Sequence, residues 1–352
     1  MKRLRLLAVF LLAVTTAACS ATPPFEDASG KALPRSVAAE EMWTLNGIAQ
    51  SVLVRGSDVA NPVLVLLHGG PGVSETALFR AYVPQLERSY LVLYWDQPGA
   101  GRSYTKEALA PPLTMERILD DLDALVDRAR ERFGREKVVL LGHSWGSALG
   151  VLYAKAHPEK VAAYVGTGQV ASMPEGEGRS YRFALEEAER RGETRAVAKL
   201  REIGPPPHDV RRMLESRHWV ERFGGTFANG MTTGSLIGAA LCTPEASVID
   251  LYRFGAGNRA SLEALWPEFS RLDLAARVTA LDVPVFLLLG DEDHVTPTSL
   301  AVAWFERLQA PCKRLHRFPG AAHNVPFEKP REFVAVLEGP VREVAMGGRC
   351  PS

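Results

Sequence analysis

Cysteine is scarce in this chain, with 4 residues among 352. The cysteines form no C-x-x-C pair and do not cluster with histidines, so the sequence indicates no structural zinc site. If Cys19 is modified, as argued below, three cysteines remain: Cys242, Cys312 and Cys350. Three thiols can form at most one disulfide. Cys312 and Cys350 are the pair that we expect to form it, since export permits a bridge.

The chain also lacks an excess of charge of either sign, because 41 basic residues balance 41 acidic ones. This balance gives no electrostatic basis for binding nucleic acid or an acidic surface, and we expect no nucleic-acid partner. With 46% hydrophobic and 23% charged residues, the composition is that of a globular protein long enough to bury a large core.

The apolar run at the N-terminus, residues 6–14, is too short to span a bilayer. It follows three basic residues and precedes a small-residue segment, which is the pattern of a secretory signal. Residues 16–19, Thr-Ala-Ala-Cys, resemble a bacterial lipobox, which implies cleavage before Cys19 and a lipid on its thiol. We therefore expect a signal peptide at 1–18, a flexible tether at 19–36, and a membrane-anchored lipoprotein facing the periplasm or the cell exterior. Ordinary signal cleavage, giving a soluble periplasmic protein, is the alternative.

Five apolar runs rich in valine and leucine predict strands buried on both faces of a parallel sheet. They are residues 63–67, 91–95, 138–141, 162–165 and 285–289. Helical patterns lie between them, of which the clearest begins after the N-cap Thr114 and ends at Gly134. This alternation predicts an α/β fold with a mostly parallel sheet flanked by helices.

The strand pattern disappears between about residues 168 and 270. This region holds a charged amphipathic helix over 181–203, a triple proline at 205–207 and a small-residue segment over 224–240. An inserted, mainly helical cap explains it better than a separate domain. The sequence thus predicts a first core part at 37–168, a cap at 169–270 and a second core part at 271–345.

A serine lies in the pentapeptide Gly142-His143-Ser144-Trp145-Gly146, between an apolar strand and a helix. This is the pattern of a nucleophile elbow, a sharp turn that exposes a serine hydroxyl while glycines let strand and helix pack closely. Such a serine needs a general base and a carboxylate that orients the base.

Candidates for both partners follow the last predicted strand. Asp293 ends a Gly-x-x-Asp segment, and His323 lies in a Gly/Ala loop, so the chain order is Ser, Asp, His. We predict His323 as the base and Asp293 as its orienting carboxylate. Asp291 is an alternative, because it is nearly as close to the strand end. His143 inside the elbow is interpreted as a packing residue behind the turn.

The developing oxyanion of an acyl transfer needs two hydrogen-bond donors. The backbone N–H of Trp145, directly after the nucleophile, is one candidate. The loop His68-Gly69-Gly70-Pro71-Gly72 follows the first predicted parallel strand and is placed to supply the second.

Three segments, residues 68–72, 96–103 and 142–147, together resemble the proline iminopeptidase (prolyl aminopeptidase) family of serine peptidases within the α/β hydrolases. The resemblance covers about residues 45–168 and 275–335. It implies an α/β-hydrolase fold and a second oxyanion donor at the backbone of Gly70. The chain departs from the family pattern at Pro98, where the family usually has Arg, and at His143, where it usually has Gly.

The family's cap carries glutamates that bind the substrate's free amino group, but their motifs are absent here. Among the glutamates of the cap we consider six as candidates for this role: Glu175, Glu177, Glu186, Glu187, Glu221 and Glu245. We therefore predict an exported serine hydrolase that acts on a small-molecule or short-peptide substrate and needs no metal or organic cofactor. The resemblance favours an aminopeptidase releasing a small N-terminal residue such as proline. An esterase or lactonase with the same triad is the alternative, and a non-catalytic binding protein on this fold is a lesser one.

Overall fold

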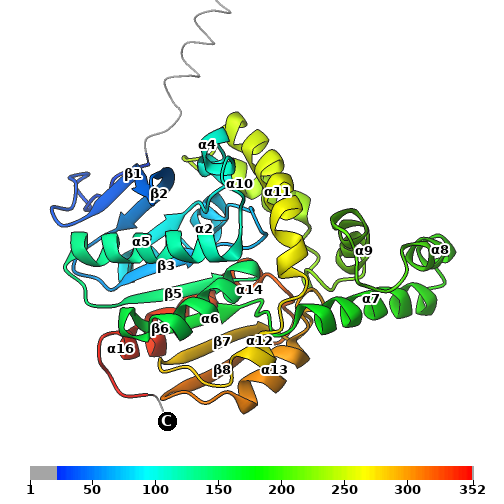
Figure 1. Ribbon diagram of the computed structural model, residues 1–352. Helices are drawn as coiled ribbons and strands as arrows, with labels where there is room; N and C mark the ends of the chain where they lie inside the picture. Colours follow the sequence, from blue (N-terminus) through cyan, green and yellow to red (C-terminus); the bar gives the residue numbers. More distant parts are fainter. Residues whose placement is uncertain (1–21, 351–352) are drawn as a thin grey trace, which may run out of the picture.

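A computed structural model describes residues 22–350, whose eight strands form one sheet (Figure 1). The strand order is β1-β2-β4-β3-β5-β6-β7-β8. β2 pairs antiparallel with both β1 and β4, and the other neighbours are parallel. The strands are β1 (Val37–Leu45), β2 (Ile48–Gly56), β3 (Val63–Leu67), β4 (Leu91–Trp95), β5 (Val138–His143), β6 (Val161–Thr167), β7 (Val285–Gly290) and β8 (Lys313–Phe318).

All five predicted strands are present, and β3 and β4 have the predicted bounds. β1, β2 and β8 were not predicted, and two of these lie at the edges of the sheet. β1 and β8 are mostly half-buried and carry charged residues, so they lack the continuous apolar run of a central strand. β1 and β2 form a hairpin whose turn, Asn46-Gly47, has positive φ at both residues.

Helices cover both faces of the sheet. Alternate side chains of a strand point to opposite faces, and the central strands are apolar at nearly every position, so both faces have to be buried. α5, α6 and α13 pack on the face that contains Val65 and Leu287. α2, α3, α14 and α15 pack on the other face, which contains Leu66 and Phe286. The core helices are α2 (Thr76–Tyr82), α3 (Leu86–Ser89), α4 (Lys106–Leu109), α5 (Met115–Phe133), α6 (Trp145–Ala156), α12 (Leu274–Arg277), α13 (Thr298–Arg307), α14 (Val325–Glu328), α15 (Pro330–Val336) and α16 (Arg342–Ala345).

The longest core helix, α5, has the predicted ends. The Thr114 side chain accepts a hydrogen bond from the N–H of Arg117, and Gly134 ends the helix in the left-handed conformation. Both end signals could be read directly from the sequence.

The segment between β6 and β7 is helical, and it lies beside the sheet as a cap (Figure 1). Its helices are α7 (Met173–Arg190), α8 (Thr194–Ile203), α9 (Val210–Arg222), α10 (Thr233–Leu241) and α11 (Val248–Phe269). α7, α8 and α9 share a small apolar core that includes Ala184, Leu200 and Phe223. The single helix expected over 181–203 is wrong, because Gly192 at φ 67° turns the chain between α7 and α8.

The two ends of the described chain pack on the core. Phe25 stacks under the guanidinium of Arg55 at 4.7 Å, and the flexible tether expected over 19–36 stays a prediction. Cys312 and Cys350 form the predicted disulfide. The predicted signal peptide and Cys19 lie outside the described residues. Within residues 22–350, no helix has the length and apolar composition needed to cross a membrane.

Candidate active site

Ser144 lies at the apex of a strained turn between β5 and α6. Its φ of 52° is positive, and its N–H donates to the carbonyl of Thr167 on the neighbouring strand at 3.0 Å. The glycines around it leave no room for a side chain. A Cβ on Gly142 would lie 2.5 Å from the carbonyl oxygen of Gly146, and a Cβ on Gly146 would collide with the carbonyl of Leu67. The turn therefore has the geometry of a nucleophile elbow.

The structure brings Asp293 and His323 together from the loops after β7 and β8. Asp293 Oδ2 lies 2.9 Å from Nδ1 of His323. The N–H groups of Val295 and Thr296 donate to Oδ1 of Asp293 at 2.8 and 2.9 Å, and the hydroxyl of Thr296 donates to Oδ2. Burial opposes the charged carboxylate, yet His323 and these donors hold the pKa of Asp293 below its ordinary value. The carboxylate is therefore fixed, ionised and aimed at one ring nitrogen.

The alternative carboxylate, Asp291, points elsewhere. Its Oδ1 accepts a hydrogen bond from Arg317 on β8 at 2.7 Å, and the pair lies at the surface. Because Asp293 lies against Nδ1 of His323, Nε2 is the ring nitrogen without a partner in this pair. Ser144 and His323 line the same cavity.

The glycine loop after β3 lies against the elbow. Gly70 lines the cavity and has a φ of 116°, and a Cβ there would lie 2.6 Å from the N of Gly72. Gln97, from the loop after β4, links this loop to the elbow. Its side chain accepts from Nε1 of Trp145 at 2.9 Å and donates to the carbonyl of His68. Gln97 thus connects the glycine loop with Trp145, the first residue of α6, and Gly70 and Ser144 line one cavity.

A buried ion pair, which the sequence did not reveal, connects the elbow with the glycine loop and with the loop of His323. Glu75 Oε1 lies 2.6 Å from Nδ1 of His143, and Glu75 Oε2 accepts the N–H of Gly69 at 3.1 Å. His143 Nε2 lies 3.2 Å from the backbone carbonyl of His323. Burial disfavours the imidazolium, but the Glu75 carboxylate outweighs it and raises the pKa of His143. His143 is therefore buried in the elbow and makes polar contacts there. The sequence analysis did not identify Glu75 as its partner.

Replacing Glu75 by glutamine is expected to lower the free energy of unfolding by about 3 kcal/mol at pH 6, because it leaves a buried imidazole without its counter-charge. A histidine whose pKa is raised on folding contributes stability below its unfolded value of 6.5, and that contribution is lost as the pH rises through the folded value. The difference between wild type and Glu75→Gln should therefore shrink between pH 6 and pH 9. Urea unfolding at the two pH values measures it.

The surface pair supplies the control for this experiment. Asp291→Asn removes an exposed carboxylate beside Arg317, so its effect on unfolding should stay within about 0.5 kcal/mol at both pH values. An equal loss of stability at pH 6 and pH 9 in Glu75→Gln would contradict a charged Glu75–His143 pair.

The cavity, about 380 Å³ in volume, lies between the core and the cap. The core contributes Ser144, His323 and Gly70, and α10 and α11 contribute apolar side chains: Leu236, Ile237, Leu241, Leu251 and Phe254. Ser261 of α11 donates to the carbonyl of Gly99 at 3.2 Å, which holds the cap against the core. The site therefore offers a serine and an imidazole at the base of a largely apolar chamber.

One of the six cap glutamates, Glu245, lines this cavity. It is buried in the connection between α10 and α11, and its Oε1 lies 3.1 Å from Arg80. Its Oε2 has no hydrogen-bond partner among residues 22–350. Burial opposes the charge, but Thr22 and Arg80 hold the pKa of Glu245 below its ordinary value, so the carboxylate is ionised. Residues 22–350 contain no group of three or more His, Cys, Asp or Glu that could hold a metal ion.

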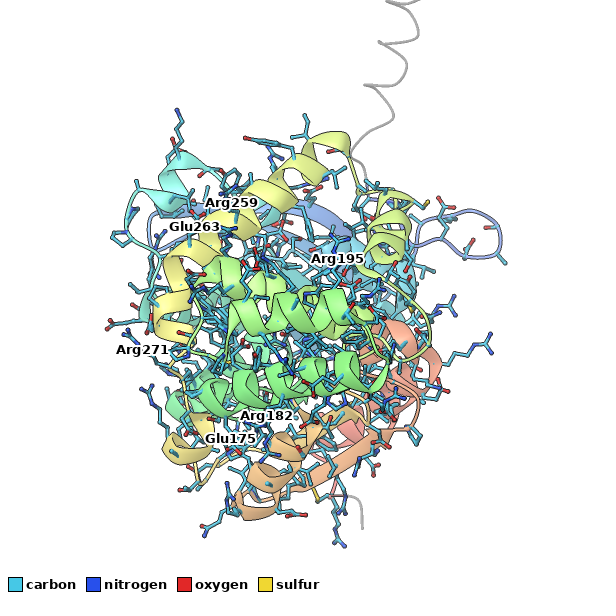
Figure 2. All side chains as sticks on the ribbon, turned by 90° about the vertical axis from the view of Figure 1, so that its right-hand side faces the viewer. Glu175, Arg182, Arg195, Arg259, Glu263 and Arg271 are labelled. Carbon is cyan, nitrogen blue, oxygen red and sulfur yellow. A yellow bond between two sulfur atoms is a disulfide. The ribbon has the colours of Figure 1, made fainter. Side chains whose placement is uncertain are left out.

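The remaining cap glutamates lie away from the cavity. Glu175 is on the surface of α7 (Figure 2), where it pairs with Arg179. Glu177 is buried but paired with Arg217. The others face solvent or neighbouring cap residues, so Glu245 is the one of these six glutamates that lines the cavity. Asp250 of α11 also lines it, and its carboxylate pairs with Arg102 at 3.0 Å.

Comparisons with known proteins agree with the fold. A family model described as alpha/beta hydrolase fold matches residues 62–220, and a model described as serine aminopeptidase, S33, matches residues 271–330. The probable aminopeptidase YbaC of Bacillus subtilis is 29% identical over 306 residues, which are 86% of this chain and 96% of that protein. The proline iminopeptidase of Saccharolobus solfataricus is 36% identical over 124 residues, which are 34% of this chain and 36% of that protein.

Solved structures show the same fold. The crystal structure of a proline iminopeptidase from Mycobacterium smegmatis superposes with a TM-score of 0.63 at 20% identity. The superposition covers 88% of this chain and 99% of that one, so it includes the cap as well as the sheet.

Proposed function

Because this chain is a proline iminopeptidase-like α/β hydrolase, we propose that it is an aminopeptidase that releases a small N-terminal residue such as proline from short peptides. The observation that carries this proposal is the ionised carboxylate of Glu245 in the cavity that also holds Ser144. Oε2 of this carboxylate is buried without a hydrogen-bond partner among residues 22–350. A free N-terminal ammonium group that displaces the side chains covering Oε2 would give it a charge-assisted hydrogen bond.

The reaction uses the proposed triad Ser144, His323 and Asp293. Ser144 Oγ attacks the carbonyl of the N-terminal residue while Nε2 of His323 takes the hydroxyl proton. The backbone N–H groups of Gly70 and Trp145 stabilise the oxyanion. His323 then protonates the leaving amine, and a water, activated by the same imidazole, hydrolyses the acyl-enzyme. Asp293 holds the imidazole in the required tautomer throughout.

A substrate panel tests the choice of bond. We expect turnover of proline or alanine arylamides, and Glu245→Gln should raise KM for the arylamide by about 10- to 100-fold because a charge-assisted hydrogen bond is weakened. Hydrolysis of p-nitrophenyl butyrate, which has no amino group, should change little. The matched control is Glu175→Gln, since Glu175 pairs with Arg179 on the surface of α7 and does not line the cavity. Turnover of the ester alone would reject the aminopeptidase proposal.

An esterase or lactonase is the second candidate, and the apolar lining from α10 and α11 favours it. Side chains such as Leu236, Leu251 and Phe254 would accommodate an acyl chain without any need for an amino group. In that case Glu245→Gln would affect ester and arylamide alike, and butyrate esters would outperform every arylamide.

We also propose that the chain is exported and carries a lipid on Cys19, which anchors it to a membrane facing the periplasm or the cell exterior. The basic and apolar N-terminal segments and the lipobox-like residues 16–19 support this. Processing should be blocked by globomycin and by Cys19→Ala. Processing that is insensitive to both would indicate the soluble periplasmic alternative.

A further inference from the structure

Four large apolar side chains are exposed where α10 ends and α11 begins. This group, which we call the apolar tip, consists of Leu241 (45% exposed), Ile249 (62%), Leu251 (42%) and Tyr252 (68%). Leu241 ends α10, and the other three lie in the first turns of α11. Leu241 and Leu251 also line the cavity that contains Ser144. The apolar tip therefore lies at the entrance of the cavity.

The apolar tip carries no free charge. Between residues 231 and 253 the charged residues are Glu245, Asp250 and Arg253. Glu245 is buried beside Arg80, and Asp250 pairs with Arg102 at 3.0 Å and with Arg253 at 3.4 Å. Figure 2 labels five charged residues on other parts of the cap: Glu175, Arg182, Arg195, Arg259 and Glu263. A neutral, apolar end on an otherwise charged cap indicates a surface that contacts a nonpolar partner.

The N-terminal end of the described chain lies next to the apolar tip. Thr22 donates a hydrogen bond to Oε1 of Glu245 at 2.8 Å, and the carbonyl of Pro23 accepts one from Arg55 at 2.8 Å. Glu245 lies in the short connection between α10 and α11. Cys19 is three residues before Thr22 in the sequence, so chain length limits the separation of their Cα atoms to about 11 Å. Any membrane attachment through this end would hold the apolar tip close to the bilayer.

We propose that the apolar tip docks on a lipid bilayer and turns the mouth of the cavity toward it. Aliphatic side chains and a tyrosine on one helix end are suited to the boundary between headgroups and acyl chains. The absence of free charge predicts binding to a neutral bilayer that changes little with salt. This interaction does not depend on which bond the enzyme cleaves.

Phosphatidylcholine vesicles test the proposal with the full chain carrying Cys19→Ala, which prevents lipid attachment. Leu7→Arg and Leu12→Arg are added so that the N-terminal apolar run cannot insert by itself. Cys242, next to Leu241, is then the reactive thiol, because it is free and exposed while the other two cysteines are bridged. An environment-sensitive fluorophore on Cys242 should shift to shorter wavelength with vesicles and be quenched by spin-labelled acyl chains.

Variants identify the surface that binds. The double substitution Ile249→Asp and Tyr252→Asp should weaken vesicle binding at least about 10-fold, because it places two charges where apolar groups enter the bilayer. Leu214→Asp is the matched control, since Leu214 is 50% exposed on α9, in a different helix of the cap. It should bind like the parent. Hydrolysis of a soluble ester should be unchanged, because Ile249 and Tyr252 do not line the cavity.

Three results would overturn the proposal. They are no fluorescence shift with vesicles, equal binding by the double variant and its parent, and a dimer in sedimentation velocity that the double variant abolishes without vesicles. The last result would assign the apolar tip to a second copy of the chain. If the double variant unfolds, the single substitution Tyr252→Ser should still weaken binding measurably.

Discussion

Ser144→Ala is expected to abolish labelling by a fluorophosphonate and to lower kcat by about 10⁵-fold or more. The hydroxyl is the proposed nucleophile, and without it there is no oxygen to form the acyl-enzyme. Alanine keeps the Cβ and meets the same backbone strain at φ 52°, so the elbow should keep its conformation. His323→Ala should also prevent efficient labelling, because the imidazole that takes the proton is removed. Gel fluorescence and turnover of the best substrate measure both effects.

Ser147→Ala is the control, since it changes a serine three residues away in the same turn. The Ser147 hydroxyl donates to the carbonyl of Ser144 at 2.6 Å and accepts the N–H of Val170 at 3.0 Å. It is engaged in structure, so this variant should still be labelled even if its thermal stability falls. Strong labelling of Ser144→Ala would show that another residue reacts with the probe. Strong labelling of His323→Ala would show that His323 is not needed as the base.

The elbow could be predicted because its signals are local. A buried strand needs a continuous apolar run, and the bend after it needs small residues on both sides of the serine. The contacts of Gly142 and Gly146 with backbone atoms explain why those two positions are glycines. The same reasoning predicted α5, whose ends are marked by Thr114 and Gly134. Short-range signals of this kind do not depend on where the rest of the chain lies.

The cap could be predicted as a helical insertion over 169–270, but its side-chain contacts with the core and the ion pairs could not, because their partners are distant in sequence. Glu75 and His143 are separated by 68 residues, and Arg80 and Glu245 by 165. Nothing in the sequence near Glu245 distinguishes it from the five other cap glutamates. What distinguishes it is burial between α10 and α11 beside the cavity, which depends on how the cap folds over the core. Specificity therefore remains the part that the sequence leaves open.

The second large effect is expected at the carboxylate that orients His323. Two aspartates follow β7 two residues apart, and the sequence alone left both as candidates. In the structure, Asp293 is buried and hydrogen-bonded to Nδ1 of His323, whereas Asp291 pairs with Arg317 at the surface. The contacts of Asp293 with Val295 and Thr296 also fix the loop, so the substitution has to preserve its shape.

Asp293→Asn is expected to lower kcat by about 10³- to 10⁴-fold while leaving fluorophosphonate-accessible Ser144 in place. Asparagine has the size of aspartate, but it removes the negative charge that stabilises the imidazolium and can hold His323 in the wrong tautomer. Asp291→Asn should change kcat less than about twofold, because its partner Arg317 lies outside the site. Steady-state kinetics measure kcat for both variants, and thermal unfolding shows whether each variant is still folded. A large loss in Asp291→Asn with normal turnover in Asp293→Asn would reverse the assignment, since only the carboxylate that contacts Nδ1 can stabilise the charge formed during proton transfer.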